Sequence, residues 1–338
     1  MQRACGTSLE AAIDIGNKIA LGQIEAGIAG GTDSISDAPI VYPRSYQQLL
    51  LASYRGRSAW QRLSPWFGLR PKHFRPVLPA VIEPRTGLSM GQSTELMVKQ
   101  WHVTRAEQDQ LAYDSHLKAA SAWREGFYDD LVVPYLGLKN DNNVRADASL
   151  DKLARLRPSF ATDGTLTAGN STPLTDGASA VLLATPEWAA QRSLPVLAYL
   201  RNGKAWAVDF VGGKEGLLMA PTYAVPAMLR DAGITLQGFD YYEIHEAFAA
   251  QVLCTLKAWE SPDYCREVLG LPEPLGSIDR ARLNVKGGSV ALGHPFAATG
   301  TRILATLAKL LAGDPSAKRG LISVCTAGGM GVTAIVER

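Results

Sequence analysis

Two cysteines and two histidines stand where the chain passes from one expected element to the next. Cys5 lies in the segment ACGTS, His245 in HEAFAAQ, His294 in GGSVALGHPFAATG and Cys325 in CTAGGMG. A cysteine acts as a nucleophile when a nearby base or a positive field favours its thiolate, and histidine is the commonest base. Taken one at a time, each residue also has a structural explanation, as a buried inert thiol or as a turn histidine.

The helix expected to position Cys5 spans about residues 4–23, where apolar residues recur on one face. Thr7, Ser8 and Glu10 resemble an N-terminal capping cluster. Cys5 then lies at or just before the helix N-terminus, where unpaired N–H groups and the helix dipole favour an anion. We therefore expect a lowered pKa for this thiol, with a buried, inert cysteine as the alternative.

Both histidines are expected at the start of a helix. The strand 241–244 leads to His245, and a helix is predicted to begin within HEAFAAQ. His294 follows a glycine-rich segment, and Pro295 suits a first helical turn. Apolar residues between 303 and 311 then recur at helical spacing, which predicts one buried helix face.

Short apolar runs predict the strands of an α/β fold. They lie at 26–31, 180–184, 196–200, 320–324 and 332–336. Cys325 would stand at the carboxyl end of its strand, where ligand sites of open α/β sheets gather. The order of reactive residue, long helix and apolar strand occurs twice, which predicts two similar stacked half-domains. The polar loop that begins at Thr165 could approach a ligand or serve only as a turn.

Residues 37–160 break this α/β rhythm. From 54 to 85 there are seven Lys or Arg residues and one acid, Glu83, interleaved with aromatic residues. Such a stretch could contact a membrane surface, nucleic acid or an anionic cofactor, or it could be a solvated insertion packed through its aromatic side chains. Helices are predicted at 90–101 and 104–126, the second opened by a capping box.

The overall composition is that of an ordinary globular protein. At 46% hydrophobic and 20% charged, 338 residues can bury a large core in more than one domain. The net charge of +2 gives no general attraction to nucleic acid. The four cysteines are scattered, so neither a zinc site nor a disulfide framework is predicted, and a reduced cytoplasmic compartment is expected. No apolar run predicts a membrane span.

Taken together, these motifs resemble those of the thiolases, acyltransferases that act on coenzyme A thioesters. ACGTS resembles the nucleophile motif, GGTDSIS the strand edge that follows it, and GNSTPLTDGA the loop before the last strand of the first half. HEAFAAQ, GGSVALGHPFAATG and CTAGGMG resemble the remaining active-site motifs, so the likeness spans residues 4–331. Many thiolases carry Asn where this chain has His245. HEAF is similar to the β subunit of the trifunctional fatty-acid oxidation complex and its bacterial relatives.

The resemblance implies a role for each reactive residue. Cys5 would take the acyl group as a thioester, with His294 as its base. Cys325 would be the second acid/base, which protonates the leaving acetyl-CoA carbanion or takes its proton in the reverse condensation. His245 would hold a water or donate directly toward the enolate oxygen. The backbone N–H groups of Cys5 and Ala327 would form a further oxyanion hole.

The resemblance also implies substrates and partners. Met90 would cover the acyl pocket and Gly328 would contact substrate, while no metal and no tightly bound cofactor are expected, since coenzyme A is a substrate. A homodimer or tetramer, and the α subunit of a multifunctional β-oxidation complex, are the implied protein partners. Neither a nucleic-acid partner nor a transmembrane segment is expected. A ketoacyl synthase relative is a further alternative, but it leaves Cys325 before GGMG unexplained.

The implied fold is α/β and thiolase-like, with two pseudo-repeated βαβαβ half-domains in stacked layers. Residues 1–36 and 161–190 would form the first half-domain, 37–160 an inserted loop domain, and 191–338 the second half-domain. Family members have several strands and helices before the nucleophile, so the first half-domain is predicted to be N-terminally truncated, with exposed strand edges. A fragment, a misplaced start codon and a catalytically inactive, partner-binding subunit are the explanations left open.

Overall fold

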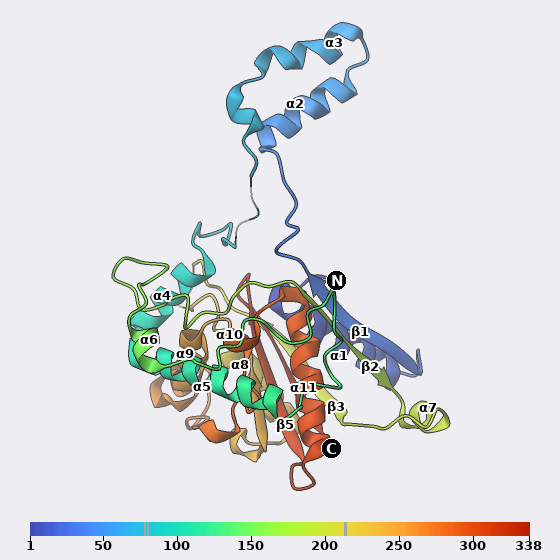
Figure 1. Cartoon of the computed structure of the whole chain (residues 1–338), viewed down its shortest axis with the longest axis vertical. Helices are drawn as coiled ribbons and strands as arrows, with labels where there is room; N and C mark the ends of the chain where they lie inside the picture. Colours follow the sequence, from blue (N-terminus) through green and yellow to red (C-terminus); the bar gives the residue numbers. More distant parts are fainter. Residues whose placement is uncertain (78, 80, 213–214) are drawn as a thin grey trace. The chain divides into compact units, whose positions relative to one another are not determined.

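The computed structural model describes residues 1–77, 79, 81–212 and 215–338 (Figure 1). It divides into two compact units, residues 1–33 with 83–338, and residues 34–82. The strands are β1 (Ala26–Asp33), β2 (Gly177–Ala184), β3 (Tyr199–Ala207), β4 (Tyr241–Ile244), β5 (Arg319–Thr326) and β6 (Met330–Glu337). The α-helices are α1 (Thr7–Ala20), α2 (Arg44–Arg55), α3 (Ala59–Leu63), α4 (Met90–Trp101), α5 (Arg105–Arg124), α6 (Leu150–Ala154), α7 (Pro186–Gln191), α8 (Pro221–Ala232), α9 (Ala249–Glu260), α10 (Ser289–Leu292) and α11 (Thr299–Gly313).

The larger unit is built on a four-stranded sheet with the order β3-β6-β5-β4. β5 and β6 form an antiparallel hairpin in which Cys325 pairs with Gly331, and β4 runs parallel to β5. The side chains of β5 alternate between two cores. Ile322 and Val324 pack in one apolar cluster, whereas Leu321 and Cys325 pack in the other. A strand buried on both faces is expected to be mostly apolar, and β5 is apolar from Gly320 to Cys325 except for Ser323.

Two helices fill the layer between this sheet and the smaller one. α1 and α11 pack on each other and contact strands of both sheets, so that their apolar faces meet β5 and β6 on one side and β1 on the other (Figure 1). Their close crossing depends on Gly300. A Cβ at that position would lie 2.4 Å from the backbone nitrogen of Leu9. On the opposite face of the four-stranded sheet lie α8 and α9, which carry much of the larger apolar core.

The smaller sheet consists of β1 and β2, paired antiparallel from Ala26 opposite Ala184 to Asp33 opposite Gly177. The prediction of a buried strand at 26–31 is right about the strand and wrong about its burial. Ala29 alone is buried in β1, and Ile28 is 71% exposed. The physical reason is that helices cover one face of this sheet, whereas the described residues leave the other face open.

The bounds of α4 and α5 were well predicted, but the cap of α1 was not. α4 and α5 have the lengths expected from the sequence, and Thr104 and Glu107 form the capping box of α5. The capping cluster expected for α1 is wrong, because Gly6 is the N-cap and no side chain caps that helix. The hydroxyl of Thr7 donates instead to the carbonyl of Ala4, and the hydroxyl of Ser8 accepts from the N–H of Thr301. Ser8 thereby joins α1 to α11.

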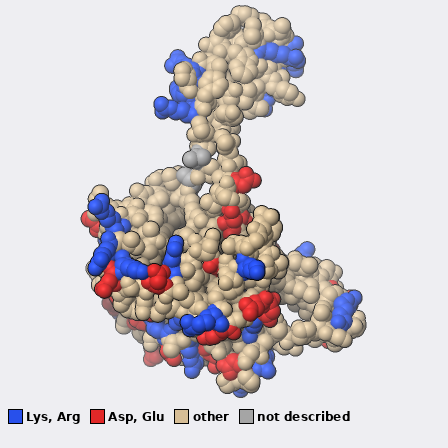
Figure 2. Space-filling model, viewed as in Figure 1, with Lys and Arg blue, Asp and Glu red and all other residues tan. Residues whose placement is uncertain are grey.

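The unit formed by residues 34–82 is a separate helical hairpin. α2 and α3 pack on each other with two short 3-10 helices, Ser64–Gly68 and Pro71–Phe74. Lys and Arg residues dominate its charged surface (Figure 2). Several of its large apolar side chains are exposed, namely Tyr54, Trp60, Leu63, Phe67 and Phe74.

The boundaries of the compact units differ from the predicted inserted segment. Residues 83–160 belong to the larger unit, because α4 and α5 pack against α9 and the short α6 packs against α5. The division into half-domains 1–36 with 161–190 and 191–338 stays a prediction. No helix within the described residues is long and apolar enough to cross a membrane.

Candidate active site

Three of the four predicted reactive side chains meet in one buried cluster. The sulfur of Cys5 and one ring nitrogen each of His245 and His294 all lie within 4.8 Å of one another. The two imidazole rings have centroids 4.1 Å apart and are tilted by 47°. Cys5 as a residue is partly exposed, whereas its sulfur atom is buried beside the histidine nitrogens. Cys5 lies more than two hundred residues before either histidine in the sequence, yet its thiol and the two imidazoles meet at a single point.

Cys5 is held by a tight approach of its own loop to the hairpin of β5 and β6. It lies in the 3-10 turn Ala4–Gly6 immediately before α1. A Cβ on Gly6 would stand 2.7 Å from Cγ2 of Val332, so glycine is required for this contact. Burial raises the pKa of the Cys5 thiol to about 12, while backbone hydrogen bonds from Ala327 and from Cys5 itself lower it. The expected lowered pKa is therefore wrong, because desolvation outweighs the helix terminus.

Cys325 stands next to this cluster, near the carboxyl end of β5, as predicted from the sequence. Its side chain is buried, and burial raises the pKa of its thiol well above the ordinary value. The second cause of the raised pKa is the negative charge that Cys5 would carry as a thiolate. The two thiols are close enough to influence each other electrostatically, and ionising both at once is unfavourable.

His294 is fixed by its ring and by its backbone. Its Nδ1 lies 2.6 Å from the hydroxyl oxygen of Thr299, and its backbone N–H donates to the carbonyl of Pro173 at 3.0 Å. Burial, and next the charge of Arg302, lower the pKa of His294 to about 3. Pro295 does not lie in the first turn of a long helix as predicted. A 3-10 turn, Phe296–Ala298, intervenes before α11 begins at Thr299.

His245 follows the last residue of β4, and its backbone N–H donates to the carbonyl of Ser323 at 2.8 Å. Its Nδ1 lies 2.8 Å from the hydroxyl oxygen of Ser289. Burial, the neighbouring His294 and the charge of Arg302 lower the pKa of His245 well below its ordinary value. The expected helix begins at Ala249, so His245 is a strand-end residue followed by a short loop.

The polar loop from Thr165 holds both histidine segments. The hydroxyl of Thr172 donates to the backbone carbonyl of Ser289 at 2.6 Å, and its N–H donates to the carbonyl of Ala247. The carbonyl of Asn170 accepts from the N–H of Ala249. This loop therefore positions the segments that carry His245 and His294. The sequence left open whether the loop approaches a ligand or serves only as a turn, and these contacts are a structural role.

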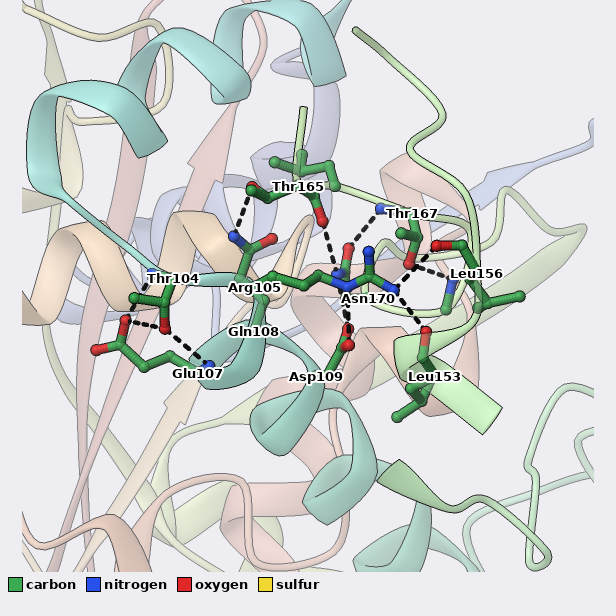
Figure 3. A network of polar contacts seen from close by, with 12 residues as sticks. Thr104, Arg105, Glu107, Gln108, Asp109, Leu153, Leu156, Thr165, Thr167 and Asn170 are labelled. Atoms are coloured by element: carbon green, nitrogen blue, oxygen red, sulfur yellow. Dashed lines mark hydrogen bonds and ion pairs between the residues drawn. The ribbon is translucent and has the colours of Figure 1, made fainter. Parts of the chain in front are cut away.

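Helix α5 supports that loop in turn (Figure 3). The side-chain amide of Asn170 donates to Asp109 at 2.9 Å, and Arg105 donates to the other oxygen of Asp109 at 2.7 Å. Gln108 donates to the hydroxyl of Thr165 at 2.8 Å. The buried Asp109 carboxylate is thus paired and hydrogen-bonded, which makes the junction between helix and loop rigid.

Known proteins share both the sequence and the fold. The family model described as the thiolase N-terminal domain matches residues 1–187, and the thiolase C-terminal domain matches residues 194–338. The chain belongs to the thiolase family. It is 44% identical over 345 residues to a 3-ketoacyl-CoA thiolase of Erwinia tasmaniensis, covering 100% of this chain and 78% of that protein. A 3-ketoacyl-CoA thiolase of Vibrio cholerae is 43% identical and covers 99% of this chain and 78% of its own length.

The fold comparison agrees. The crystal structure of the Bacillus anthracis acetyl-CoA acetyltransferase matches with a TM-score of 0.79 and 30% identity, and the match covers 100% of this chain and 78% of that one. The predicted α/β thiolase-like fold, the family and the acyltransferase class are therefore confirmed. The chain is an enzyme of the thiolase type. The roles of single residues are not tested by these likenesses and stay predictions.

Three further residues predicted for the thiolase site lie in different places. Ala327 follows β5, and its backbone bonds to the Cys5 thiol, as an oxyanion-hole donor next to the nucleophile would. Gly328 comes next in the hairpin turn, exposed and with a φ of 77°. Met90 is the first residue of α4 and packs, half-buried, against the larger core. The substrate contacts of Met90 and Gly328 stay predictions.

Sequence reasoning missed the residues that orient the imidazoles. Thr299 and Ser289 contact the two Nδ1 atoms, and Arg302 donates to the Ser289 hydroxyl at 2.7 Å. All three belong to the same stretch as His294, so proximity in sequence was a usable signal. Which hydroxyl would meet which ring depends on the fold of α10 and α11.

Proposed function

We propose that this chain cleaves a 3-ketoacyl-CoA with coenzyme A, giving acetyl-CoA and a shortened acyl-CoA through an acyl thioester on Cys5, and that it also runs the reverse condensation. The observation that carries the proposal is the convergence of Cys5, His245 and His294 beside the second thiol of Cys325. Neither histidine is protonated near neutral pH, because burial lowers both pKa values. A neutral imidazole can accept the proton of a thiol.

In the first step, Cys5 gives its proton to His294 as its sulfur attacks the 3-keto carbon. The raised pKa of the free thiol means that proton transfer accompanies attack rather than preceding it. The oxygen of the tetrahedral adduct becomes negative. Backbone N–H groups of Cys5 and Ala327 are placed beside the sulfur and would stabilise this charge.

In the second step, the bond between carbons 2 and 3 breaks, and the acyl group stays on Cys5. The electron pair leaves as the enolate of acetyl-CoA, and the thiol of Cys325 supplies the proton that completes acetyl-CoA. His245 donates toward the enolate oxygen, either directly or through a water. The thiolate of Cys325 then takes the proton of the incoming coenzyme A thiol. The coenzyme A thiolate formed in this way attacks the acyl-Cys5 carbonyl. Cys5 leaves as a thiolate and regains its proton from His294.

We further propose that the chain serves fatty-acid β-oxidation in the cytoplasm, contacts substrate through Met90 and Gly328, and binds no cofactor tightly. Its similarity to 3-ketoacyl-CoA thiolases supports the choice of substrate class. We propose a homodimer or tetramer and a multifunctional β-oxidation α subunit as partners. Size-exclusion chromatography with light scattering tests the oligomer. A pull-down with an α subunit tests the second partner.

The decisive experiment compares two identical substitutions. Cys5→Ala removes the proposed nucleophile, whereas Cys254→Ala removes a buried thiol of α9 that lies outside the site. Thiolysis of acetoacetyl-CoA is followed by the loss of substrate absorbance, and the acyl-enzyme is trapped by acid quench and located by peptide mass spectrometry. We expect Cys5→Ala to lose activity and acylation and Cys254→Ala to keep both. An acyl group found elsewhere, or full activity of Cys5→Ala, overturns the mechanism.

A further inference from the structure

The two active-site imidazoles have the same pattern of polar contacts. In each ring Nδ1 faces a hydroxyl, at 2.6 Å in His294 and 2.8 Å in His245. In each ring Nε2 is buried and has no hydrogen-bond partner among the described residues. A neutral imidazole carries one N–H, and the partner of one nitrogen decides which of the two bears the proton. The two hydroxyls therefore determine what each ring offers to a substrate.

The hydroxyl of Thr299 is committed as a donor. It donates to the backbone carbonyl of Pro295 at 3.1 Å, one helical turn back. Its proton is therefore engaged, and its oxygen accepts from the Nδ1–H of His294. Nε2 of His294 then carries an unengaged lone pair and can act as a base.

The hydroxyl of Ser289 is committed in the opposite sense. Nη2 of Arg302 donates to its oxygen at 2.7 Å, and a guanidinium can only donate. Within the described part of the chain, His245 Nδ1 is the one atom in contact with this oxygen that can accept its proton. Nδ1 of His245 is then an acceptor, and its Nε2 carries the proton.

We propose that Ser289, anchored by Arg302, is a positioning residue that holds His245 as the Nε2–H tautomer, while Thr299 holds His294 as the opposite tautomer. The cluster then contains one N–H donor and one bare nitrogen on two rings whose centroids are 4.1 Å apart. The donor matches a developing enolate oxygen, and the bare nitrogen matches the proton of Cys5. For its catalytic consequence, though not for the tautomers, this assignment rests on the proposed function.

The surroundings of Arg302 agree with such a role. Its Nε and Nη1 atoms are buried without a partner among the described residues, an arrangement that costs stability. Its positive charge is a cause of the lowered pKa of both His245 and His294. Burial is the main cause of the lowered pKa of both rings, and the charge of Arg302 adds to it. Through Ser289, Arg302 also orients His245.

The direct test reads the tautomers. The protein is labelled with ¹⁵N at histidine, and long-range ¹⁵N–¹H spectra distinguish a protonated ring nitrogen from a bare one. His245→Asn and His294→Asn assign the two signals. We expect Nε2–H for His245 and Nδ1–H for His294 in the full chain, and a mixture at His245 in Ser289→Ala. A bare Nε2 on His245, or the same tautomer in both rings, overturns the proposal.

The kinetic test compares the removal of two buried hydroxyls. Ser289→Ala removes the positioning hydroxyl, whereas Thr255→Ala removes a fully buried hydroxyl that donates to the Gln251 carbonyl within α9. We expect Ser289→Ala to lower kcat for thiolysis about tenfold to a hundredfold with little change in KM. Thr255→Ala should change neither. The rate at which iodoacetamide alkylates Cys5 should be unchanged in both, because His294 and not His245 serves that thiol.

A double-mutant cycle separates positioning from a structural effect. In the His245→Asn background, Ser289→Ala should cause no further loss of kcat, since the ring it orients is gone. An equal loss in both backgrounds, or slower alkylation of Cys5, overturns the positioning role. The outcomes stay distinguishable from failure of the proposed function. If the unaltered chain cleaves no 3-ketoacyl-CoA while the tautomer spectra are as expected, the reaction is wrong and the tautomer assignment stands.

Discussion

The four-stranded and two-stranded sheets show how surroundings decide what an apolar strand does. In β5, seven of eight residues are buried, whereas β1, also eight residues long and also apolar in its first half, has one buried residue. β5 has helices on both faces, and β1 has them on one. Two of the reactive residues lie on or directly after strands of the buried four-stranded sheet, and none lies on the exposed two-stranded one. Cys325 lies in β5 and His245 directly after β4, in the layer from which water is excluded.

The smaller sheet supports the site without entering it. A carboxylate oxygen of Asp33, at the end of β1, accepts from the N–H of Ala297 at 2.6 Å. This hydrogen bond fixes the loop that follows His294 to the end of β1. The comparison indicates that two reactive residues lie on or beside strands of the buried sheet. By contrast, β1 supports the site through its last residue, Asp33.

The largest expected effect concerns β5 itself. Cys325→Ala should lower kcat for thiolysis about a thousandfold, because the enolate of acetyl-CoA loses its proton donor. Alkylation of Cys5 by iodoacetamide should continue at a similar rate, since His294 is untouched. Cys265→Ala, another buried thiol, is the control and should keep normal kinetics. Substantial thiolysis by Cys325→Ala would move the chemistry away from this strand.

Next in size is the contact between the Cys5 loop and the β5–β6 hairpin. Gly6→Ala should lower kcat/KM about tenfold or more, because its methyl group would meet Cγ2 of Val332 at 2.7 Å and push the thiol away from the histidines. The alkylation rate of Cys5 should change as well. Val332→Ala makes room for the methyl group, so the double variant should recover reactivity toward iodoacetamide. If it does not, the Cys5 loop is not positioned by this contact.

A third test concerns Glu243, buried in β4. Burial raises the pKa of this carboxyl to about 8, with Arg302 opposing the shift, against 4.5 for an ordinary glutamate. The folded state therefore binds more protons than the unfolded state between pH 4.5 and 8, and the free energy of unfolding falls as pH rises through that window. The lowered pKa values of His245 and His294 act in the opposite direction, but only below pH 6.5.

The window from pH 6.5 to 8 thus isolates Glu243. We expect the chain to lose about 2 kcal/mol of unfolding free energy across it, relative to Glu243→Gln, whose side chain cannot ionise. Urea titrations of both proteins at the two pH values provide the measurement. Parallel curves for the two proteins would mean that this carboxyl is ionised in the folded state.

The smallest expected effect sharpens the comparison most directly. The same substitution is made in each sheet, as Ile322→Val in β5, where the side chain is 0% exposed, and as Ile28→Val in β1, where it is 71% exposed. Ile322→Val should cost about 1 kcal/mol of unfolding free energy, and Ile28→Val less than about 0.5 kcal/mol. Equal losses in the two variants would mean that the outer face of β1 is covered in solution.

Periodicity and motif order were enough for most of the fold. The helices α4, α5 and α8 and the strand β4 follow from local patterns, since apolar spacing, a capping box and the glycine after α8 are readable without tertiary contacts. Burial was harder, as Ile28 shows, because it depends on which layers lie on each side of a strand. The cap of α1 failed for a related reason. Ser8 bonds across to α11 instead of to its own helix.

By itself, the sequence determined that this is a thiolase-type protein with two reactive thiols and two histidines at the ends of elements, because those features are local in the chain. The tertiary structure alone decided that the Cys5 thiol has a raised pKa, since desolvation depends on everything packed around the sulfur. It also decided which hydroxyl each imidazole meets. A tautomer follows from the second partner of that hydroxyl, and such a partner is set by how α10 and α11 fold against the sheet.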